Sequence, residues 1–356
     1  MAELLLHLEK LRQNLDTVLA FAQTRNLSLL LVTKVIQSRP DLLTLINHPA
    51  LSRIADLHAV NLAKLPRGVT ERAHLRPRVS NALETARHCD RVFLSDTRVA
   101  QALAQARESL GLPPLRVSIM VEAGDLRDGV PWDDLPAVVK TIASFEGITV
   151  EGLGVNLGCL SGVIPTTESM ERCAEGLRRV RKLSAEPLPG FSVGGTVYWE
   201  DLRQGFPAEF TEFRLGEAAF FGYNTSKGVP IMELEEGVFT LDLEVLEVWK
   251  KNVGDVPPGE AGLNAFGQKI HSLVTGLRQR AVLDGGENLA PMSALRPLNE
   301  KTFLVGQTHE YTVLDCTGVE VPEVGGRVSF HAAYEAVARS FLSPFLQLRV
   351  IEQETL

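Results

Sequence analysis

Hydrophobic and polar positions change their period along the chain, and each pattern predicts a different structure. Leucines recur at helical spacing near the amino terminus, so a packing helix is predicted from Ala2 to about Arg25. The next stretch, residues 27–40, begins with an unbroken apolar run and ends at polar and breaker residues. Such a run is typical of a strand that is buried on both faces of a parallel sheet.

Strand-like and helical stretches then alternate as far as about residue 230. The predicted strands are 53–57, 73–79, 91–94, 115–121, 149–155, 190–193 and 212–215, and the predicted helices are 41–47, 61–65, 82–88, 98–110, 135–145 and 166–183. About eight strand-helix units result, the number that closes a (β/α)8 TIM-type barrel. A doubly wound open sheet is the alternative. The barrel is preferred because polar and glycine-rich residues follow nearly every strand at its carboxyl end, where such barrels build their sites.

The pattern changes again near Phe239. Thr240–Val248 alternates apolar and acidic residues with a period of two, which is typical of a strand with one face in water. Further strands separated by glycine and proline turns are predicted at 279–283, 302–304, 311–314, 326–330 and 345–351. We therefore predict an α/β barrel domain over residues 1–235 and a mostly β domain over residues 236–356.

Composition limits the class of protein. The chain has 356 residues, 45% of them hydrophobic, and a formal net charge of -8, so it can form two soluble domains. Charges of both signs are mixed along it, which argues against nucleic acid as a partner. It lacks a signal-peptide pattern and an apolar run of about 20 residues, so a cytoplasmic protein without a membrane partner is expected.

The four cysteines are Cys89, Cys159, Cys173 and Cys316, and they show no C-x-x-C spacing. Neither a disulfide framework nor a zinc site is therefore indicated, and reduced thiols are expected.

Lys34 lies near the carboxyl end of the first predicted barrel strand. Desolvation there disfavours the ammonium form, so the amine becomes available as a nucleophile toward a carbonyl group. A Schiff-base lysine requires this environment. The alternative is a structural lysine that extends its ammonium group to water.

Arg127 lies in a charged, glycine-containing loop that follows the strand 115–121. A guanidinium fixed at this point can bind a carboxylate or a phenolate-like oxygen through two hydrogen bonds. The alternative is a solvated loop arginine that is paired with Asp125 or Asp128.

Two further groups of residues end late strands of the predicted barrel. Ser192–Thr196 includes two glycines that let backbone N–H groups approach an anion, and Arg214 points into the barrel mouth, where it needs a partner. Asn156 ends the strand 149–155 between small residues that leave room for a planar ring, although an ordinary turn asparagine is the alternative.

The order of these motifs resembles that of pyridoxal phosphate-dependent racemases of the alanine racemase superfamily (fold type III), with the ornithine racemase-like branch the most similar. The resemblance covers nearly the whole chain and rests on Val32-Thr33-Lys34-Val35, Ile54-Ala55-Asp56 with Asn61-Leu62, Met120-Val121 through Gly129, Gly152 through Thr166, Arg214-x-Gly216-Glu217-Ala218, Asn264-Ala265-Phe266-Gly267, Arg280 through Leu283, Val313-Leu314-Asp315 and Ser343-Pro344.

The resemblance implies roles for three basic residues. Lys34 matches the lysine that binds pyridoxal 5'-phosphate as a Schiff base. Arg214 matches the arginine that donates to the pyridine nitrogen and so limits how far the cofactor withdraws electrons. Arg127 matches the arginine near the phenolic oxygen of the cofactor and the substrate carboxylate.

Other cofactor contacts follow from the same resemblance. Asn156 stands where alanine racemases have a histidine that stacks on the ring. Thr196, Gly216 and Glu217 fall where hydroxyl and backbone groups hold the phosphate.

Two departures from alanine racemases bear on the reaction. The tyrosine that reaches the phosphate a few residues after the lysine is replaced at about Ser38. The partner subunit's β domain normally supplies a second catalytic base, a tyrosine, but residues 284–288 here contain none. Either another side chain takes the second proton, with His309, Glu310, Glu287 and Tyr311 as candidates, or one base is enough.

We therefore expect an amino-acid racemase or epimerase that works as a homodimer, with Lys34 and Arg127 from one chain and His309 or Glu310 from the other. The alternatives are an aldolase, lyase or decarboxylase that uses the same cofactor, and a carrier of the cofactor without turnover. An aldolase needs a metal site in the β domain, for which His309-Glu310 and His271 are the visible candidates. The substrate side chain is not predicted.

Overall fold

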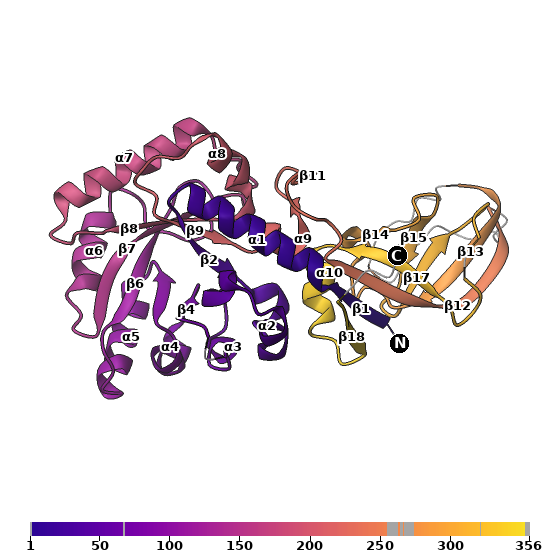
Figure 1. Cartoon of the computed structure of the whole chain (residues 1–356), viewed down its shortest axis with the longest axis horizontal. Coiled ribbons are helices and arrows are strands. Elements are labelled where there is room, and N and C mark those ends of the chain that lie inside the picture. The colour runs from indigo at the N-terminus through magenta and orange to yellow at the C-terminus, as the bar shows by residue number, and fades with distance from the viewer. Residues whose placement is uncertain are drawn as a thin grey trace. The chain divides into compact units, whose positions relative to one another are not determined.

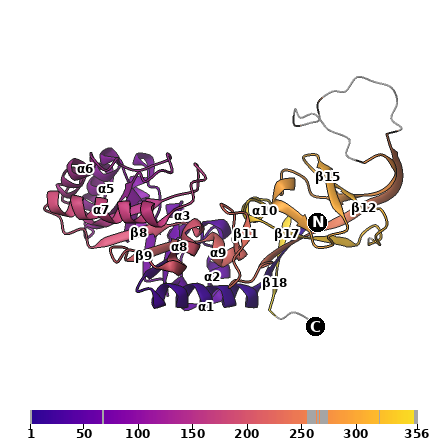
Figure 2. The same ribbon diagram turned by 90° about the horizontal axis from the view of Figure 1, so that it is seen from above.

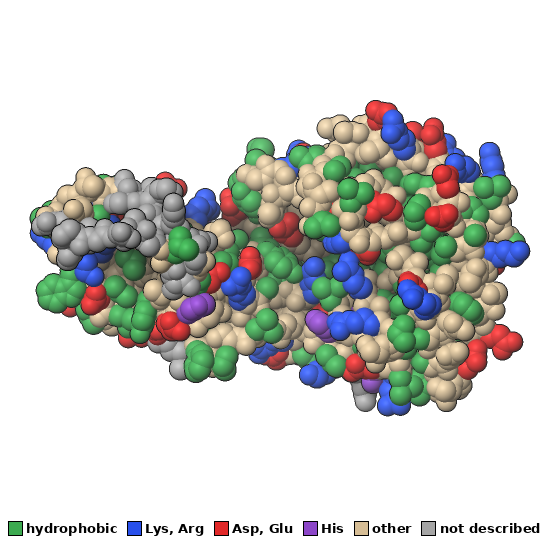
Figure 3. Space-filling view, turned by 180° about the vertical axis from the view of Figure 1, so that it is seen from behind, with side chains coloured by type: hydrophobic (Ala, Val, Ile, Leu, Met, Phe, Trp, Pro, Cys, Tyr) green, Lys and Arg blue, Asp and Glu red, His purple; other side chains and the backbone are tan. Residues whose placement is uncertain are grey.

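The computed structural model describes residues 2–66, 68–254, 263, 266, 274–320 and 322–352. The chain divides into two compact units, Lys10–Glu236 and Met1–Glu9 with Gly237–Leu356. Among the helices of these ranges, none is long and apolar enough to cross a membrane. Acidic and basic side chains are distributed together over the face shown in Figure 3.

A closed barrel of parallel strands forms the centre of the first unit (Figure 1). The strands are β2 (Ser28–Val32), β3 (Arg53–Asp56), β4 (Glu71–His74), β5 (Arg91–Leu94), β6 (Leu115–Val121), β7 (Ile148–Asn156), β8 (Gly190–Gly194) and β9 (Glu212–Leu215). They pair in chain order, and β9 closes the barrel on β2 through the pairs Leu30–Arg214 and Leu31–Leu215. The predicted (β/α)8 class is confirmed.

Helices surround this barrel, as Figure 2 shows from above. They are α1 (Leu8–Thr24), α2 (Pro40–Ile46), α3 (Ala59–Leu62), α4 (Ala82–His88), α5 (Thr97–Ser109), α6 (Leu135–Ala143), α7 (Thr167–Leu183), α8 (Trp199–Gln204) and α9 (Glu217–Phe221). Their apolar faces cover the barrel, and a buried cluster of Leu30, Ala55, Ala73, Phe93 and Met120 packs between strands. The carboxyl ends of the strands are thereby held at one mouth.

The second unit is built on a mainly antiparallel sheet in the order β14-β17-β12-β13-β16-β15. Its elements are β12 (Phe239–Val253), β13 (Gly276–Asp284), β14 (Leu295–Pro297), β15 (Phe303–Gln307), β16 (Tyr311–Asp315), β17 (Arg327–Ala332), α10 (Tyr334–Ser340) and β18 (Leu346–Ile351). The mostly β character predicted after Phe239 is confirmed. Helix α10 was not predicted.

The amino terminus differs from the prediction. A strand, β1 (Ala2–His7), replaces the first part of the predicted helix, and the helix begins only at Leu8. Burial alternates along β1, which pairs antiparallel with β12 and parallel with β18. The run of leucines fits both periods, and pairing with two strands decides the outcome. The first nine residues therefore belong with the second unit, unlike in the predicted division at residue 235.

The predicted strand 73–79 is also wrong in its bounds. Strand β4 ends at His74, and a 3-10 turn begins at Val79. Pro77 lies between them and has no N–H group to donate to a neighbouring strand.

Candidate active site

Lys34 lies in the first connection after β2, at the start of a single 3-10 turn, Lys34–Ile36. Ser38, which follows this turn, has a left-handed backbone with a φ of 46°. Its buried hydroxyl forms a hydrogen bond with Thr33 at 2.7 Å and donates to Asp56 at 2.5 Å. These bonds compensate for the backbone strain and fix the Lys34 loop against β3.

Asp56 ends β3 and is fully buried. Besides the Ser38 hydroxyl, its carboxylate accepts hydrogen bonds from the His58 backbone N–H at 2.9 Å and from Asn61 Nδ2 at 3.3 Å. Ser38 therefore serves inside the protein to hold a loop. The short side chain at this position, where alanine racemases have a tyrosine, is explained by this buried network.

The surroundings of Lys34 lower the pKa of its amine. Burial lowers the pKa of this lysine below its ordinary value, and the positive charges of Arg127 and Arg76 lower it further. Cys159 and Asp56 act in the opposite direction without reversing the shift. A lowered pKa increases the fraction of the lysine in its nucleophilic form at neutral pH.

Arg214 lies on β9, one residue before the carboxyl end of the strand, and its side chain is buried. Its Nη2 donates to the Val155 carbonyl oxygen at 2.7 Å, and its guanidinium lies over the Phe93 ring at 4.6 Å. Its Nη1 is buried without a hydrogen-bond partner among the described residues. Burial lowers the pKa of Arg214 to about 10, with a further contribution from Arg91. Arg214 is thus a cation with one donor available for a bound acceptor.

Two glycines make room for the Arg214 guanidinium. A Cβ on Gly194 would lie 2.5 Å from its Nη2, and a Cβ on Gly154 would lie 3.0 Å from its Nη1. Both glycines are in extended strands, so their small size matters here and their backbone freedom does not. Gly154, one of the small residues beside Asn156 in the sequence, therefore accommodates an arginine.

Arg127 is held from two sides in the loop after β6. Its Nε donates to Asp128 at 2.7 Å and lies 3.4 Å from Asp125. With its amide oxygen facing the available donors, Asn156 accepts from Arg127 Nη2 at 3.2 Å and donates to the Gly194 carbonyl oxygen at 3.1 Å. Burial opposes the positive charge, but the bond to Asp128 and the nearby acidic groups raise the pKa of Arg127.

The structure shows the pairing of Arg127 with Asp125 and Asp128 that was the alternative interpretation, while binding of a carboxylate or phenolate-like oxygen stays a prediction. The arginine is paired with both aspartates, and it also contacts Asn156 at the end of a neighbouring strand. Asp125 is only 2% exposed and also accepts from the Leu160 backbone N–H at 2.9 Å. Asp125 thus connects the loops after β6 and β7, a positioning role that the sequence indicated only through its proximity to Arg127.

Thr196, Gly216 and Glu217 are brought together after β8 and β9. The Thr196 hydroxyl accepts from the Ala218 N–H at 3.0 Å, which leaves its own hydrogen to donate. A Cβ on Gly216 would lie 2.8 Å from the Val32 carbonyl oxygen, so this position lies close to the end of β2. The group therefore borders the strand that leads to Lys34.

Glu217 brings an acidic side chain to this group. Burial raises its pKa, while the hydrogen bond from the Thr225 hydroxyl and the charge of Lys34 act in the opposite direction. The carboxyl group is directed to Thr225, so any contribution of Glu217 to an anion would come from its backbone.

A charged layer inside the barrel was missed by the sequence analysis. Glu212, two residues before Arg214 on the same face of β9, lies 2.6 Å from Arg53 Nη2 and 2.7 Å from Arg91 Nη1. Glu71 from β4 also pairs with both arginines, at 3.0 and 3.4 Å. The signal was available, since each of these residues starts a barrel strand with a charge.

The candidates for the second base lie in the other compact unit. His309 and Glu310 are exposed residues of the turn between β15 and β16. The His309 ring packs edge to face on Phe266, with 4.9 Å between ring centroids. Glu287 is paired with Arg339 at 3.2 Å, which makes it a weaker candidate, and Tyr311 is 45% exposed.

The described residues contain no group of three or more His, Cys, Asp or Glu side chains placed to hold a metal ion. His271, named above as a possible ligand, lies outside these residues. All four cysteines are free, and Cys159 is the exposed one.

Comparison with known families identifies the family of this chain. The family described as "Alanine racemase, N-terminal domain" matches residues 6–224. The chain belongs to this family. It is 26% identical to the lysine racemase of Thermotoga maritima, over 97% of both proteins. It is also 28% identical to the ornithine racemase of Acetoanaerobium sticklandii, over 97% of this chain and 98% of that protein.

Solved structures share the fold of this family member at low identity. The alanine racemase of Streptomyces lavendulae has a TM-score of 0.73 at 15% identity, and the match covers 99% of this chain and 97% of that one. A D-threonine aldolase from Filomicrobium marinum has a TM-score of 0.71 at 16% identity, over 96% and 88%. The same architecture therefore accompanies two different reactions, and function has to be argued from the site.

Proposed function

We propose that this chain is an amino-acid racemase that binds pyridoxal 5'-phosphate at the carboxyl end of its barrel. The observation that carries the proposal is the buried, unpartnered Nη1 of Arg214, on the strand that pairs with the Lys34 strand. A buried donor without a partner costs free energy, which a bound acceptor would recover. Two racemases related over the whole chain support the reaction class.

The residues at the mouth fit this cofactor. Lys34 has a lowered pKa, as is needed to bind an aldehyde carbon. Arg214 offers Nη1 to the ring nitrogen, and Thr196 can donate its hydroxyl hydrogen to the phosphate. Gly194 leaves room for the Arg214 guanidinium, and Gly216 lets its strand end approach the Val32 carbonyl oxygen. We assign Asn156 a contact with the cofactor ring, because its hydrogen bonds to Arg127 and Gly194 hold its amide in place beside these groups.

When bound, pyridoxal phosphate withdraws electrons from the α-carbon of the amino acid and so makes its proton acidic. Arg214 keeps its own proton at neutral pH and donates a hydrogen bond to the ring nitrogen without protonating it. Arg127, held by Asp128 and Asn156, binds the substrate carboxylate. The Lys34 amine removes or returns the α-proton on one face.

Racemisation requires a proton donor on the opposite face of the α-carbon as well. We assign that face to His309 or Glu310 of a second copy of the chain, so the working form is a two-fold symmetric homodimer. Both side chains are exposed in this chain and thus accessible to a partner.

Hybrid dimers test this arrangement. Lys34→Ala and His309→Ala chains, each inactive alone, should regain activity when their subunits are exchanged, because one site of each hybrid then has both groups. Confirmed exchange without recovered racemisation would place the second proton donor elsewhere.

The substrate class is inferred from the relatives. Because the two whole-chain relatives are named for lysine and ornithine, we infer that the substrate is an amino acid with a terminal ammonium group. The test is a panel of single-enantiomer amino acids, incubated with enzyme and cofactor and analysed by chiral chromatography.

We expect lysine or ornithine to be converted fastest, and Lys34→Ala to convert none. Preference for alanine would refute the substrate class. Release of an aldehyde or of carbon dioxide instead of the mirror-image amino acid would identify an aldolase, lyase or decarboxylase, and cofactor binding without any conversion would identify a carrier.

A further inference from the structure

A cavity of about 630 Å³ opens at the end of the barrel opposite to Lys34. Thr70, Asp90 and Pro114 line it, and each directly precedes a barrel strand, namely β4, β5 and β6. The cavity therefore lies at the amino-terminal ends of the strands, whereas the candidate active site follows their carboxyl ends. Its volume is within the range of small-molecule sites, roughly 300–1,000 Å³.

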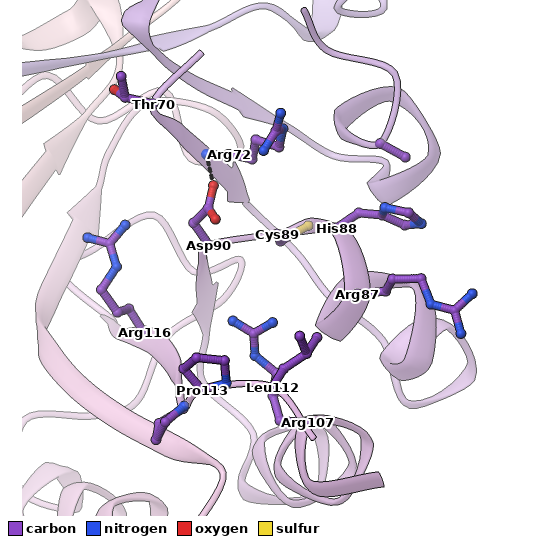
Figure 4. A pocket seen from close by; sticks show the side chains of 12 residues that line it. Thr70, Arg72, Arg87, His88, Cys89, Asp90, Arg107, Leu112, Pro113 and Arg116 are labelled. Atoms are coloured by element: carbon purple, nitrogen blue, oxygen red, sulfur yellow. Dashed lines mark hydrogen bonds between the residues drawn. The ribbon is translucent and has the colours of Figure 1, made fainter. Parts of the chain in front are cut away.

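The walls of this cavity are strongly basic. Arg72, Arg87, Arg107 and Arg116 line it, and among the described residues Asp90 is the one acidic residue of its lining (Figure 4). Arg87 points away from the centre in this view.

Two of the cavity arginines differ in how they are paired. Arg116 is shared with Glu71 and Glu151, each 3.4 Å away. The Arg72 side chain makes no hydrogen bond or ion pair within the described part of the chain. Its backbone N–H instead donates to Asp90 at 2.8 Å. Positive charge in the cavity thus exceeds what its own residues neutralise.

Arg107 shows most clearly that this surface is a built site. It is only 8% exposed, and its guanidinium rises from α5 toward the centre of the cavity (Figure 4). Nη1 donates to the Ala86 carbonyl oxygen at 2.5 Å, but Nε is buried with no hydrogen-bond partner in the described residues. Burial also lowers the pKa of Arg107, and the opposing effects of Asp90 and Cys89 do not reverse this shift. A buried, under-satisfied cation of this kind favours an anionic ligand.

We infer that this cavity binds a small organic phosphate, with Arg72 and Arg107 as ligands of the phosphate group. Guanidinium groups match phosphate oxygens in geometry and charge, and two of them balance a dianion. The cavity is much larger than a phosphate ion, and Leu112 and Pro113 provide an apolar wall for the organic part. The Asp90 carboxylate can accept hydrogen bonds from hydroxyl groups on that part.

The test is isothermal titration calorimetry on the holoenzyme, whose cofactor already occupies the other mouth of the barrel. Ribose 5-phosphate and AMP are the organic probes, and inorganic phosphate is the comparison. At least one organic probe should bind saturably at one site per chain and more tightly than inorganic phosphate. Tighter binding of AMP would indicate a nucleotide as the natural ligand, and tighter binding of ribose 5-phosphate would indicate a sugar phosphate.

Variants link the binding to the cavity. Arg72→Ala and Arg107→Ala should each weaken binding by about tenfold or more, because each removes a charge-assisted contact. Arg98→Ala is the matched control, since Arg98 lies on the same helix with an 84% exposed side chain; it should leave binding unchanged. If Arg107→Ala does not fold, the less buried Arg72 decides the result. No saturable binding by any probe, equal affinity for inorganic phosphate, or equal loss in the Arg98 control would overturn the inference.

Discussion

Replacing Glu212 with Gln should destabilise the barrel strongly. Glu212 is 3% exposed and lies between two arginines, 2.6 Å from Arg53 and 2.7 Å from Arg91. Glutamine preserves the size of the side chain but leaves the two arginines with Glu71 as a shared carboxylate partner, and Arg91 also with Glu151 at 3.3 Å. Breaking a buried ion pair in this way costs about 3–5 kcal/mol, and we expect about 3 because Glu71 compensates in part.

Thermal unfolding measures this loss. For a unit of this size, about 3 kcal/mol corresponds to a decrease in Tm of roughly 6–12 °C. The matched control is Glu200→Gln, which removes an acid whose side chain is 35% exposed and pairs with Arg203 at 3.3 Å. An exposed pair contributes about 0.5 kcal/mol, so the control should shift Tm by no more than about 2 °C.

The pH dependence of the loss gives a second test. Burial alone would raise the pKa of Glu212, but Arg91 and Arg53 more than reverse this effect, so its pKa is lowered from 4.5. The stabilisation is therefore present above about pH 4.5 and is lost as the pH falls through the lower folded-state pKa. The gap in Tm between wild type and Glu212→Gln should narrow in acid. A gap under 2 °C at neutral pH, or one that does not narrow, would refute the assignment.

Two further predictions concern the active site. Gly194→Ala places a methyl group 2.5 Å from Arg214 Nη2, so the affinity for pyridoxal phosphate, measured by visible absorbance, should fall. The control Gly68→Ala, which has open space around its Cβ, should bind the cofactor as the wild type does, and equal affinities of the two variants would contradict the proposed position of Arg214. Asn156→Ala removes the amide that orients Arg127, so kcat/KM should fall about 10- to 100-fold, and unchanged kinetics would remove Asn156 from the site.

Regular patterns allowed the overall fold to be predicted from sequence. Apolar runs separated by amphipathic helices indicated a barrel, and motifs in a fixed order indicated the family, which the match over residues 6–224 confirms. The leucine run at Ala2–His7 was misassigned because two distant strands, β12 and β18, determine its conformation. Local periodicity carries no information about such partners.

Parts of the site depend on contacts that periodicity does not encode. Ser38 looked like the loss of a phosphate ligand, but in the structure it ties a loop to Asp56. The small residues around Asn156 suggested space for a planar ring, whereas one of them, Gly154, accommodates Arg214. The charge of Glu212 at the start of its strand was visible in the sequence, but its pairing was not, because its partners come from other strands. In each case, the role of a residue depends on strands that are distant in sequence.

The central claim is that Lys34 holds the cofactor, and reduction with borohydride tests it directly. Borohydride converts a Schiff base to a stable secondary amine, so the cofactor stays on the lysine that binds it. Proteolysis and mass spectrometry of the reduced holoenzyme should then find a pyridoxyl group on the peptide that contains Lys34, and visible absorption should disappear. A label on another lysine, or no label on a protein mixed with excess cofactor, would contradict the account.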